Sequence, residues 1–448
     1  MINLIKRLLP KSVKIILKGI KSFTFDRLYY NWLLWRVPQK HKCLIKKIRK
    51  KNTISVVFLV SERSKWKADE VFQLMRNDSL FNPFIIAIPF HKRDLESQKK
   101  NVEDIKNYFF NKGYDVYSHF QDANEINKRL KSADLVFFSE PYDVSKNKFY
   151  YSDLFTNKLC FYIPYFFMAT THVKGNTLNF NGIYYRFLLS MWRIYWPHNE
   201  IKNELEKFDN RVIGTSVVTG YPSMEYIYKF SKKLVASNNA WNSAAQGKIK
   251  IIYAPHHSIF LNDPARETLS TFLKNAEIIK ELSIKYKDKV SWSFKPHPLL
   301  IHHLSEHSDW GKNKAERYYR FWQEQEYTQF DDGIYDDLFL ESDAIIHDCS
   351  SFIVEYAFTK KPCMYLVGDT DIDNYLNEFG KGVIDVYQKG KSVEEIEGFI
   401  KRLIDGKRTQ NENTNFFQRY LDDFYQHELP SKKIINDLKQ SLGYRNDN

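Results

Sequence analysis

Histidines, a lysine and prolines follow two apolar stretches in the C-terminal half of the sequence. His256 and His257 lie in the stretch YAPHHS, and Lys295 and His297 lie in the stretch FKPHP. Imidazole and ammonium groups donate hydrogen bonds and charge to phosphate oxygens. The prolines flanking His297 restrict the backbone, which suits a side chain held in one place. We therefore predict a phosphate-binding site with His297 and His257 as catalytic candidates, and Lys295 and His256 as binding candidates.

A third polar stretch follows another apolar run. Residues 342–362 read SDAIIHDCSSFIVEYAFTKKP, in which a strand is followed by Asp348 and then by a helix that begins with Ser350 and Ser351. Free amides at a helix N-terminus, assisted by serine hydroxyls, hold phosphate oxygens. Glu355 lies one turn further on and could accept hydrogen bonds from ribose hydroxyls. We predict Asp348, Ser350, Ser351 and Glu355 as donor-binding residues. The alternative is a serine-capped core helix with an exposed glutamate.

The elements around these residues alternate between short apolar stretches and stretches of helical periodicity. Strands are expected at 54–60, 84–88, 114–117, 135–138, 159–163 and 213–218, and again at 249–253, 290–294, 344–347, 363–366 and 383–386. Helices are expected at 66–75, 102–110, 125–130, 270–286, 351–358 and 393–404. Such alternation predicts βαβ units and an α/β fold with parallel sheets. Because ligands bind beyond the carboxyl ends of parallel strands, the three polar stretches should meet on one edge.

The order of these elements predicts two Rossmann-like domains. The polar, apolar-poor stretch ASNNAWNSAAQG at 236–247 is typical of a linker. The predicted divisions are a basic amphipathic N-terminal segment, an N-terminal acceptor domain, the linker, a C-terminal nucleotide-donor domain and a tail, at 1–51, 52–235, 236–247, 248–430 and 431–448.

Together, YAPHHS, FKPHP, the stretch at 342–362 and the segment TGYP at 219–222 resemble the CDP-glycerol glycerophosphotransferase family. The resemblance covers roughly residues 215–370. It implies a GT-B fold, a cytidine-diphosphate donor, and attack on the β-phosphate by an acceptor hydroxyl with release of CMP.

One family segment is not found in this sequence. The family usually carries a His-Gly-Thr-Pro segment in the N-terminal domain, whose histidine is the expected general base. Here the comparable strand end reads YIPY at 162–165 and is followed by His172, while another strand is followed by Glu140. Either side chain could accept the proton of a hydroxyl. The alternative for both is a plain loop position.

The charge of the chain favours polyanionic partners. There are 67 Lys and Arg against 54 Asp and Glu, a formal net charge of +13, and Asp26 is the only acidic residue among the first 51. Apolar residues at helical spacing alternate there with lysines, and Trp32 and Trp35 follow. This pattern indicates an interfacial helix on an anionic membrane, or else a solvated helix packed on its own protein. With no apolar run of about 18 residues, we expect a peripheral protein at the cytoplasmic face of the membrane.

Other cofactors and partners are not indicated. The four cysteines form no CxxC pair, and His302, His303 and His307 do not have the spacing of a strong zinc motif, so no metal site is expected. There is no P-loop, no GxGxxG and no nucleic-acid-binding module, so we expect no bound cofactor and no nucleic-acid partner.

These observations favour a transferase that moves a glycerol-phosphate or related polyol-phosphate group from a CDP-linked donor. The expected acceptor is a hydroxyl of a polymer or lipid-linked glycan in teichoic-acid or capsular-polysaccharide synthesis. Two alternatives remain at this point. One is a GT-B glycosyltransferase that uses a nucleotide sugar, and the other is a catalytically silent GT-B assembly module.

Overall fold

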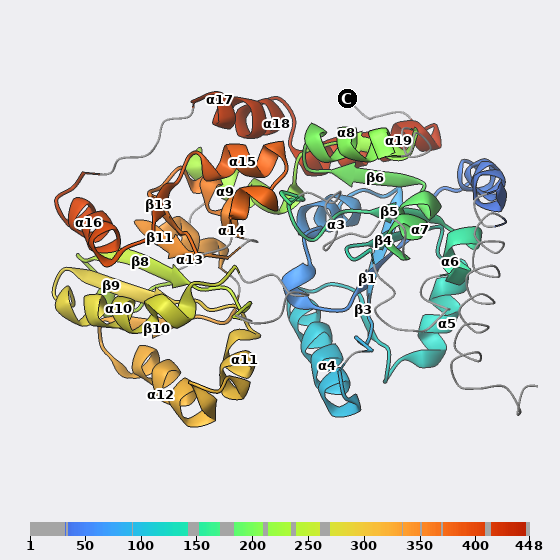
Figure 1. Ribbon diagram of the computed structural model, residues 1–448. Coiled ribbons are helices and arrows are strands. Elements are labelled where there is room, and N and C mark those ends of the chain that lie inside the picture. Colours follow the sequence, from blue (N-terminus) through green and yellow to red (C-terminus); the bar gives the residue numbers. More distant parts are fainter. Residues whose placement is uncertain are drawn as a thin grey trace, which may run out of the picture.

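The computed structural model describes residues 32, 35–91, 93–141, 152–170, 183–208, 214–233, 239–259, 269–333, 335–349, 352–368, 371–407 and 414–444. Two sheets, each flanked by helices, lie side by side (Figure 1). Every strand pairing within these sheets is parallel. The predicted α/β class with two Rossmann-like domains is confirmed.

The N-terminal sheet has the order β3-β2-β1-β4-β5-β6-β7. Its strands are β1 (Ile54–Val60), β2 (Phe81–Ala87), β3 (Val116–Ser118), β4 (Leu135–Phe138), β5 (Leu159–Tyr162), β6 (Arg193–Trp196) and β7 (Ser216–Val218). Its helices are α3 (Asp69–Arg76), α4 (Leu95–Asn111), α5 (Ala123–Ser132), α6 (Ser152–Asn157), α7 (Ile183–Ser190) and α8 (Asn199–Phe208), with a 3-10 turn at Arg63–Lys65. Buried side chains on both faces of this sheet explain why its strands are continuous apolar runs.

The C-terminal sheet has the order β10-β9-β8-β11-β12-β13. Its strands are β8 (Ile249–Ala254), β9 (Val290–Phe294), β10 (Thr328–Phe330), β11 (Ala344–His347), β12 (Cys363–Leu366) and β13 (Gln388–Gly390). The following helices belong to this half: α9 (Glu225–Ser231), α10 (Phe272–Lys285), α11 (Leu300–Glu306), α12 (Gly311–Glu324), α13 (Asp336–Glu341), α14 (Phe352–Glu355), α15 (Glu378–Ile384) and α16 (Val393–Ile404). The chain then continues through α17 (Thr414–Phe417) and α18 (Asp423–Tyr425).

One predicted strand is wrong. Residues 383–386, expected as the last strand, fall at the end of helix α15 and just beyond it. The buried residues of α15 are Phe379, Gly380, Val383 and Ile384, spaced at i, i+1, i+4 and i+5, which is the stripe of one helix face. A short apolar run of this kind does not distinguish a strand from the end of a buried helix. The sixth strand of the sheet is instead the polar segment β13.

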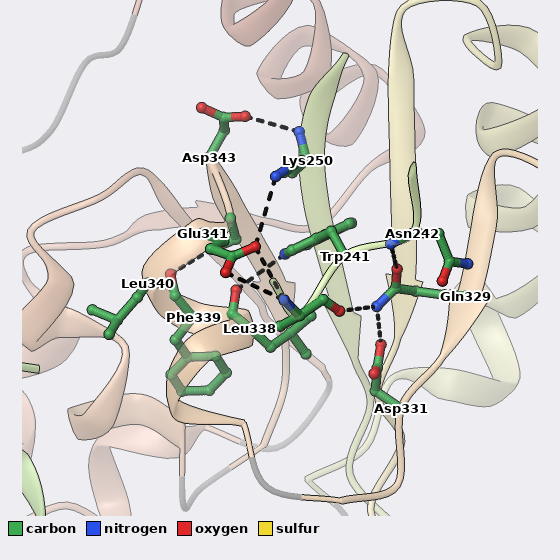
Figure 2. Close-up of polar contacts among 12 residues, drawn as sticks. Trp241, Asn242, Lys250, Gln329, Asp331, Leu338, Phe339, Leu340, Glu341 and Asp343 are labelled. Atoms are coloured by element: carbon green, nitrogen blue, oxygen red, sulfur yellow. Dashed lines mark hydrogen bonds and ion pairs between the residues drawn. The ribbon is translucent and has the colours of Figure 1, made fainter. Parts of the chain in front are cut away.

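The stretch at 236–247 is firmly attached where the structure describes it. Figure 2 shows the Gln329 side chain accepting a hydrogen bond from the Asn242 backbone at 2.9 Å, and Trp241 donating to the carbonyl of Leu338 at 3.3 Å. Both Glu341 carboxylate oxygens accept the Ala240 N–H at 3.2 Å. These contacts hold residues 240–242 against β10 and α13 of the C-terminal domain.

One of the contacts between the two domains is a short backbone junction. Asn377 donates from its backbone to the carbonyl of Ala169 at 3.0 Å and from its side chain to that of Met168 at 2.7 Å. A Cβ atom at Gly380 would lie 2.2 Å from the Ala169 carbonyl oxygen, so only glycine permits this approach.

The last helix, α19 (Pro430–Leu442), crosses back to the N-terminal domain, where it is drawn in red beside green and blue elements (Figure 1). Its residues Ile434, Ile435, Leu438 and Leu442 belong to the core built on β1 and β2. Asp437 accepts a hydrogen bond from the Tyr195 hydroxyl at 3.0 Å. The predicted tail at 431–448 therefore contains a core helix.

Part of the predicted N-terminal segment is described. Residues 35–48 are helical, and Ile48, Leu44 and Ile45 pack on the N-terminal core, while Trp32 and Trp35 are 46% and 60% exposed. Residues 1–31, where the amphipathic pattern is strongest, lie outside the described part of the chain. Among the described residues, no helix is both long and apolar enough to cross a membrane.

Candidate active site

Both sheets have a switch point where the strand order reverses, and we refer to the carboxyl edge of each sheet at this point as its crevice. In the C-terminal sheet β8 lies between β9 and β11, so the connections that leave β8 and β11 diverge to opposite sides. In the N-terminal sheet β1 and β4 have the same relation. Ligands of open α/β sheets bind at such switch points, beyond the carboxyl ends of the strands.

The C-terminal crevice is organised by a fully buried carboxylate. Asp348, which follows β11, accepts the backbone N–H of His256, which follows β8, at 2.6 Å. Its other oxygen accepts the backbone N–H of Thr271 and the Thr271 hydroxyl, the latter at 2.8 Å. Burial raises the pKa of Asp348 to about 6. One side chain therefore holds the loop after β8 and the start of α10 against the end of β11.

Four histidine rings meet in front of this carboxylate. The ring centroids of His257 and His297 are 4.1 Å apart, those of His256 and His257 are 4.3 Å apart, and His303 lies 5.2 Å from His257. Burial lowers the pKa of His257 to about 4 and that of His297 to about 3, and it lowers the pKa of His256 well below its ordinary value. The rings of His256, His257 and His297 are therefore neutral at neutral pH.

The backbone indicates which ring nitrogen carries the proton. The N–H of Leu299 donates to Nδ1 of His297 at 3.2 Å, and the N–H of Ser258 donates to Nδ1 of His256 at 3.3 Å. A neutral imidazole that accepts at Nδ1 carries its proton at Nε2. His256 and His297 can therefore each offer an Nε2–H to an anion. Nδ1 of His257 is buried and has no hydrogen-bond partner among the residues that the structure describes.

A second polar group joins the two domains. The Lys67 ammonium, from the N-terminal domain, lies 2.9 Å from the Tyr335 hydroxyl and 3.3 Å from Glu355 Oε1, and the Tyr335 hydroxyl donates to Glu355 Oε2. The Lys295 ammonium lies 5.3 Å from the centre of the same Tyr335 ring and donates to the carbonyl of Gly333 at 2.9 Å. Burial lowers the pKa of Lys295.

The N-terminal crevice is filled differently. Glu140, which follows β4, accepts the hydroxyl of Ser61, which follows β1, and forms an ion pair with Lys65. Among the described residues, these partners of Glu140 all come from its own domain. Glu140 is 6% exposed, and Lys65 balances the charge of its carboxylate.

A pocket of about 410 Å³ opens beside His297, between the end of β9 and helices α11 and α12. Apolar and polar side chains share its lining: Pro296, His297, Pro298, Ile301, Glu316, Tyr319, Arg320, Gln323, Phe330 and Asp332. The open space therefore lies next to His297, the one histidine of the cluster among its lining residues.

A family model described as CDP-glycerol:poly(glycerophosphate) glycerophosphotransferase matches residues 198–435, more than half of the chain. The chain belongs to this family. The matched residues include the C-terminal sheet, the histidine cluster and Asp348. The resemblance predicted from the sequence is confirmed, and the chain is a transferase.

Solved structures with the same fold include sugar-nucleotide enzymes. A putative UDP-N-acetylglucosamine 2-epimerase from Listeria monocytogenes matches with a TM-score of 0.55 and 13% identity, over 88% of this chain and 98% of that one. MnaA of S. aureus in complex with UDP matches with a TM-score of 0.54 and 12% identity, over 88% and 98%. A variant of the wall teichoic acid polymerase TagF matches at 0.49 and 15% identity, over 94% and 98%. A comparison with the sequences of curated proteins gave no match.

The structure of this glycerophosphotransferase-family member brings most of the predicted residues of the donor half together. His256, His257, His297 and Asp348 form one cluster, while Lys295 and Glu355 adjoin the ring of Tyr335. Asp348 faces the loops that it holds, which supports a positioning function rather than direct contact with a donor. Ser350, Ser351 and His172 lie outside the described residues. The helix expected at 351–358 is the single turn α14 followed by a 3-10 turn at Ala357–Thr359.

Glu140 lies in the other domain, and no described contact joins it to the histidines. Among the described residues, no group of three His, Cys, Asp or Glu has an arrangement that could hold a metal ion.

Several residues of the site were missed from the sequence. Lys65 and Lys67 lie directly after β1 in the stretch SERSKWK, so the same strand-end rule, applied to the N-terminal half, could have identified them. Thr271 and Tyr335 carry no such signal, because each contributes through a contact distant in sequence.

Proposed function

We propose that the chain transfers a glycerol-phosphate or related polyol-phosphate group from a CDP-linked donor to a polymer or lipid-linked acceptor hydroxyl. The acceptor belongs to a cell-surface polymer of the teichoic-acid or capsular type. The observation that carries this proposal is the family membership of the segment containing the C-terminal crevice, where neutral histidines cluster and one of them, His297, lines a pocket.

The reaction is a substitution at the β-phosphorus of the donor. The acceptor oxygen forms a bond to this phosphorus, the bond from the phosphorus to the bridging oxygen breaks, and CMP leaves with the electron pair. Negative charge grows on the departing phosphate, so hydrogen bonds from Nε2–H of His297 and His256 strengthen as the bond breaks. His257 adjoins both rings and contributes to the same electrostatic environment.

The acceptor proton needs a base from the N-terminal domain. His172 and Glu140 are the candidates from the sequence. Glu140 can act only if its hydroxyl and ammonium partners leave it, because both of its oxygens are engaged. This requirement favours His172 of the two.

The donor is identified by measuring nucleotide release from CDP-glycerol, CDP-ribitol and a panel of nucleotide sugars. We expect CMP from a CDP-polyol and no turnover of nucleotide sugars. Turnover of a nucleotide sugar alone would make the protein a glycosyltransferase, and lack of turnover with every donor and acceptor would favour an assembly module.

Calorimetric titration of CDP tests the donor site itself. Binding should be lost in the double variant Ser351→Ala, Glu355→Ala. Unchanged binding would mean that Ser351 only begins a helix and that Glu355 only forms a buried contact between the domains.

We also propose that the enzyme works peripherally at the cytoplasmic face of an anionic membrane. The support is the basic composition of residues 1–51 together with the exposed Trp32 and Trp35. Flotation with anionic liposomes at physiological salt should be markedly weaker when residues 1–31 are removed, a deletion that leaves the packed helix at 35–48 in place. Equal flotation of both proteins would contradict this part of the proposal.

A further inference from the structure

The carboxylate of Glu355 is fully engaged in the structure. Lys67 contacts Oε1 at 3.3 Å, Tyr335 donates to Oε2, and the side chains of Lys67 and Glu355 are only 11% and 4% exposed. A ribose hydroxyl that approaches this carboxylate must compete with the Lys67 ammonium. Donor binding at Glu355 is therefore an exchange of partners.

The displaced ammonium would remain close to the same site. Lys67 lies 5.2 Å from the centre of the Tyr335 ring, and Lys295 lies 5.3 Å from it. Two ammonium groups, one from each domain, thus flank a single ring next to the turn α14. A nucleoside diphosphate brings its negative charge to this position, and a partly buried ammonium released from a carboxylate needs a new anionic partner.

We infer that Lys67 is a donor-binding residue contributed by the N-terminal domain, which exchanges Glu355 for the diphosphate of the donor. In the structure Lys67 pairs with Glu355 and joins the two domains. In the loaded protein Glu355 accepts ribose hydroxyls while Lys67 and Lys295 contact the phosphates. This inference rests on the proposed function, because it requires a cytidine-diphosphate donor at Glu355.

The exchange predicts opposite effects on two ligands. CDP contains the ribose and the diphosphate, whereas cytidine contains only the ribose and base. Loss of the ammonium removes a contact to CDP, but it also removes the group that competes with cytidine for Glu355. A lysine that only stabilises the domain interface would affect both ligands alike.

The experiment is calorimetric titration of the full chain with CDP and with cytidine. We expect Lys67→Ala to weaken CDP binding about tenfold to a hundredfold, the scale of one charge-assisted contact, while cytidine binding is unchanged or tighter. Lys67→Arg should recover most of the CDP affinity. The matched control is Lys229→Ala, which removes a different interdomain ion pair, from Lys229 to Glu70 at 2.9 Å, and should leave both ligands unaffected.

Equal weakening of CDP and cytidine by Lys67→Ala, or no weakening of CDP, would overturn the inference. Failure of the unmodified chain to bind CDP would refute the proposed function and this inference with it. If the unmodified chain binds CDP and Lys67→Ala shows the same selectivity between CDP and cytidine, the inference alone is refuted and the proposed function is not. Thermal unfolding of each variant establishes that it is folded.

Discussion

The two switch-point crevices have the same strand order and different chemistry. In each, a carboxylate follows the fourth strand of its sheet and accepts a hydrogen bond from one of the first two residues after the first strand: Glu140 from Ser61, and Asp348 from His256. In the N-terminal crevice Lys65 balances the carboxylate. In the C-terminal crevice the donors to Asp348 are backbone amides and hydroxyls, and neutral histidines surround it.

If the donor binds as proposed, topology fixes where a ligand can bind, while the charge already present decides which ligand the crevice accepts. The N-terminal crevice is internally neutralised by an ion pair. In the C-terminal crevice, burial keeps the histidines uncharged until an anion arrives, and a nearby anion raises the pKa of an imidazole. The second arrangement is suited to a diphosphate.

The largest expected effect is on turnover in the C-terminal crevice. His297→Ala should lower kcat on the order of a hundredfold or more, because a donor whose hydrogen bond strengthens in the transition state is lost. The KM for the donor should change much less. Steady-state kinetics with the correct donor measures both.

Other kinetic results for His297→Ala would give His297 a different role. Near-normal kcat with a strongly raised KM would make it a plain binding residue, and normal kinetics would make it structural. The corresponding change in the other crevice, Glu140→Gln, should lower kcat less than tenfold. A loss as large as that of His297→Ala would identify Glu140 as the base and remove the contrast between the crevices.

The next effect concerns stability in the N-terminal crevice. Lys65→Met should destabilise the protein by about 2 kcal/mol, because it leaves the Glu140 carboxylate buried without its cation. The double variant Lys65→Met, Glu140→Gln should recover part of this loss, since the uncompensated charge is then gone. Urea unfolding measures both. A double variant as unstable as the sum of the two single variants would show that the pair is not coupled.

The smallest effect is a pH dependence that belongs to the C-terminal crevice. The pKa of Asp348 is raised to about 6, so between about pH 4 and pH 6 the folded chain holds a proton that the unfolded chain has released, and this contribution to stability falls as pH rises. The histidines with lowered pKa make a contribution to stability that rises with pH. Asp348→Asn removes only the falling contribution.

The destabilisation caused by Asp348→Asn should therefore shrink with rising pH, by about 1 kcal/mol for each pH unit across that window. Unfolding of both proteins at pH 4.5, 5.5 and 6.5 tests this. A pH-independent difference would mean that Asp348 titrates as an ordinary carboxyl.

Local patterns predicted the elements that carry the site. Strands β1, β4, β9, β11 and β12 and helix α16 have the predicted bounds, because each is a strongly apolar or strongly periodic run. His256, His257, His297 and Asp348 could be placed together because parallel strands end on one edge. This step needs only the α/β alternation and the strand-end rule.

The parts of the fold and of the site that could not be predicted depend on contacts between residues distant in sequence. Strands β6, β10 and β13 are short and contain polar or aromatic residues, so no single-sequence pattern separates them from loops. The partners of Glu140, Glu355 and Asp348 come from segments 75 or more residues away in several cases. The sequence shows which side chains are ionisable, whereas the fold determines which charges are already paired.

Helix α19 has a consequence for how the protein is made. The core of the N-terminal domain includes Ile434, Leu438 and Leu442, and Tyr195 and Asp78 bond to Asp437 and Lys439 of this helix. A ribosome completes the first domain's sheet long before it has synthesised these residues. Apolar side chains of the emerging domain therefore stay uncovered until residues 430–442 have been translated, so a chain stalled or cut before residue 430 is a natural target for chaperones and proteases.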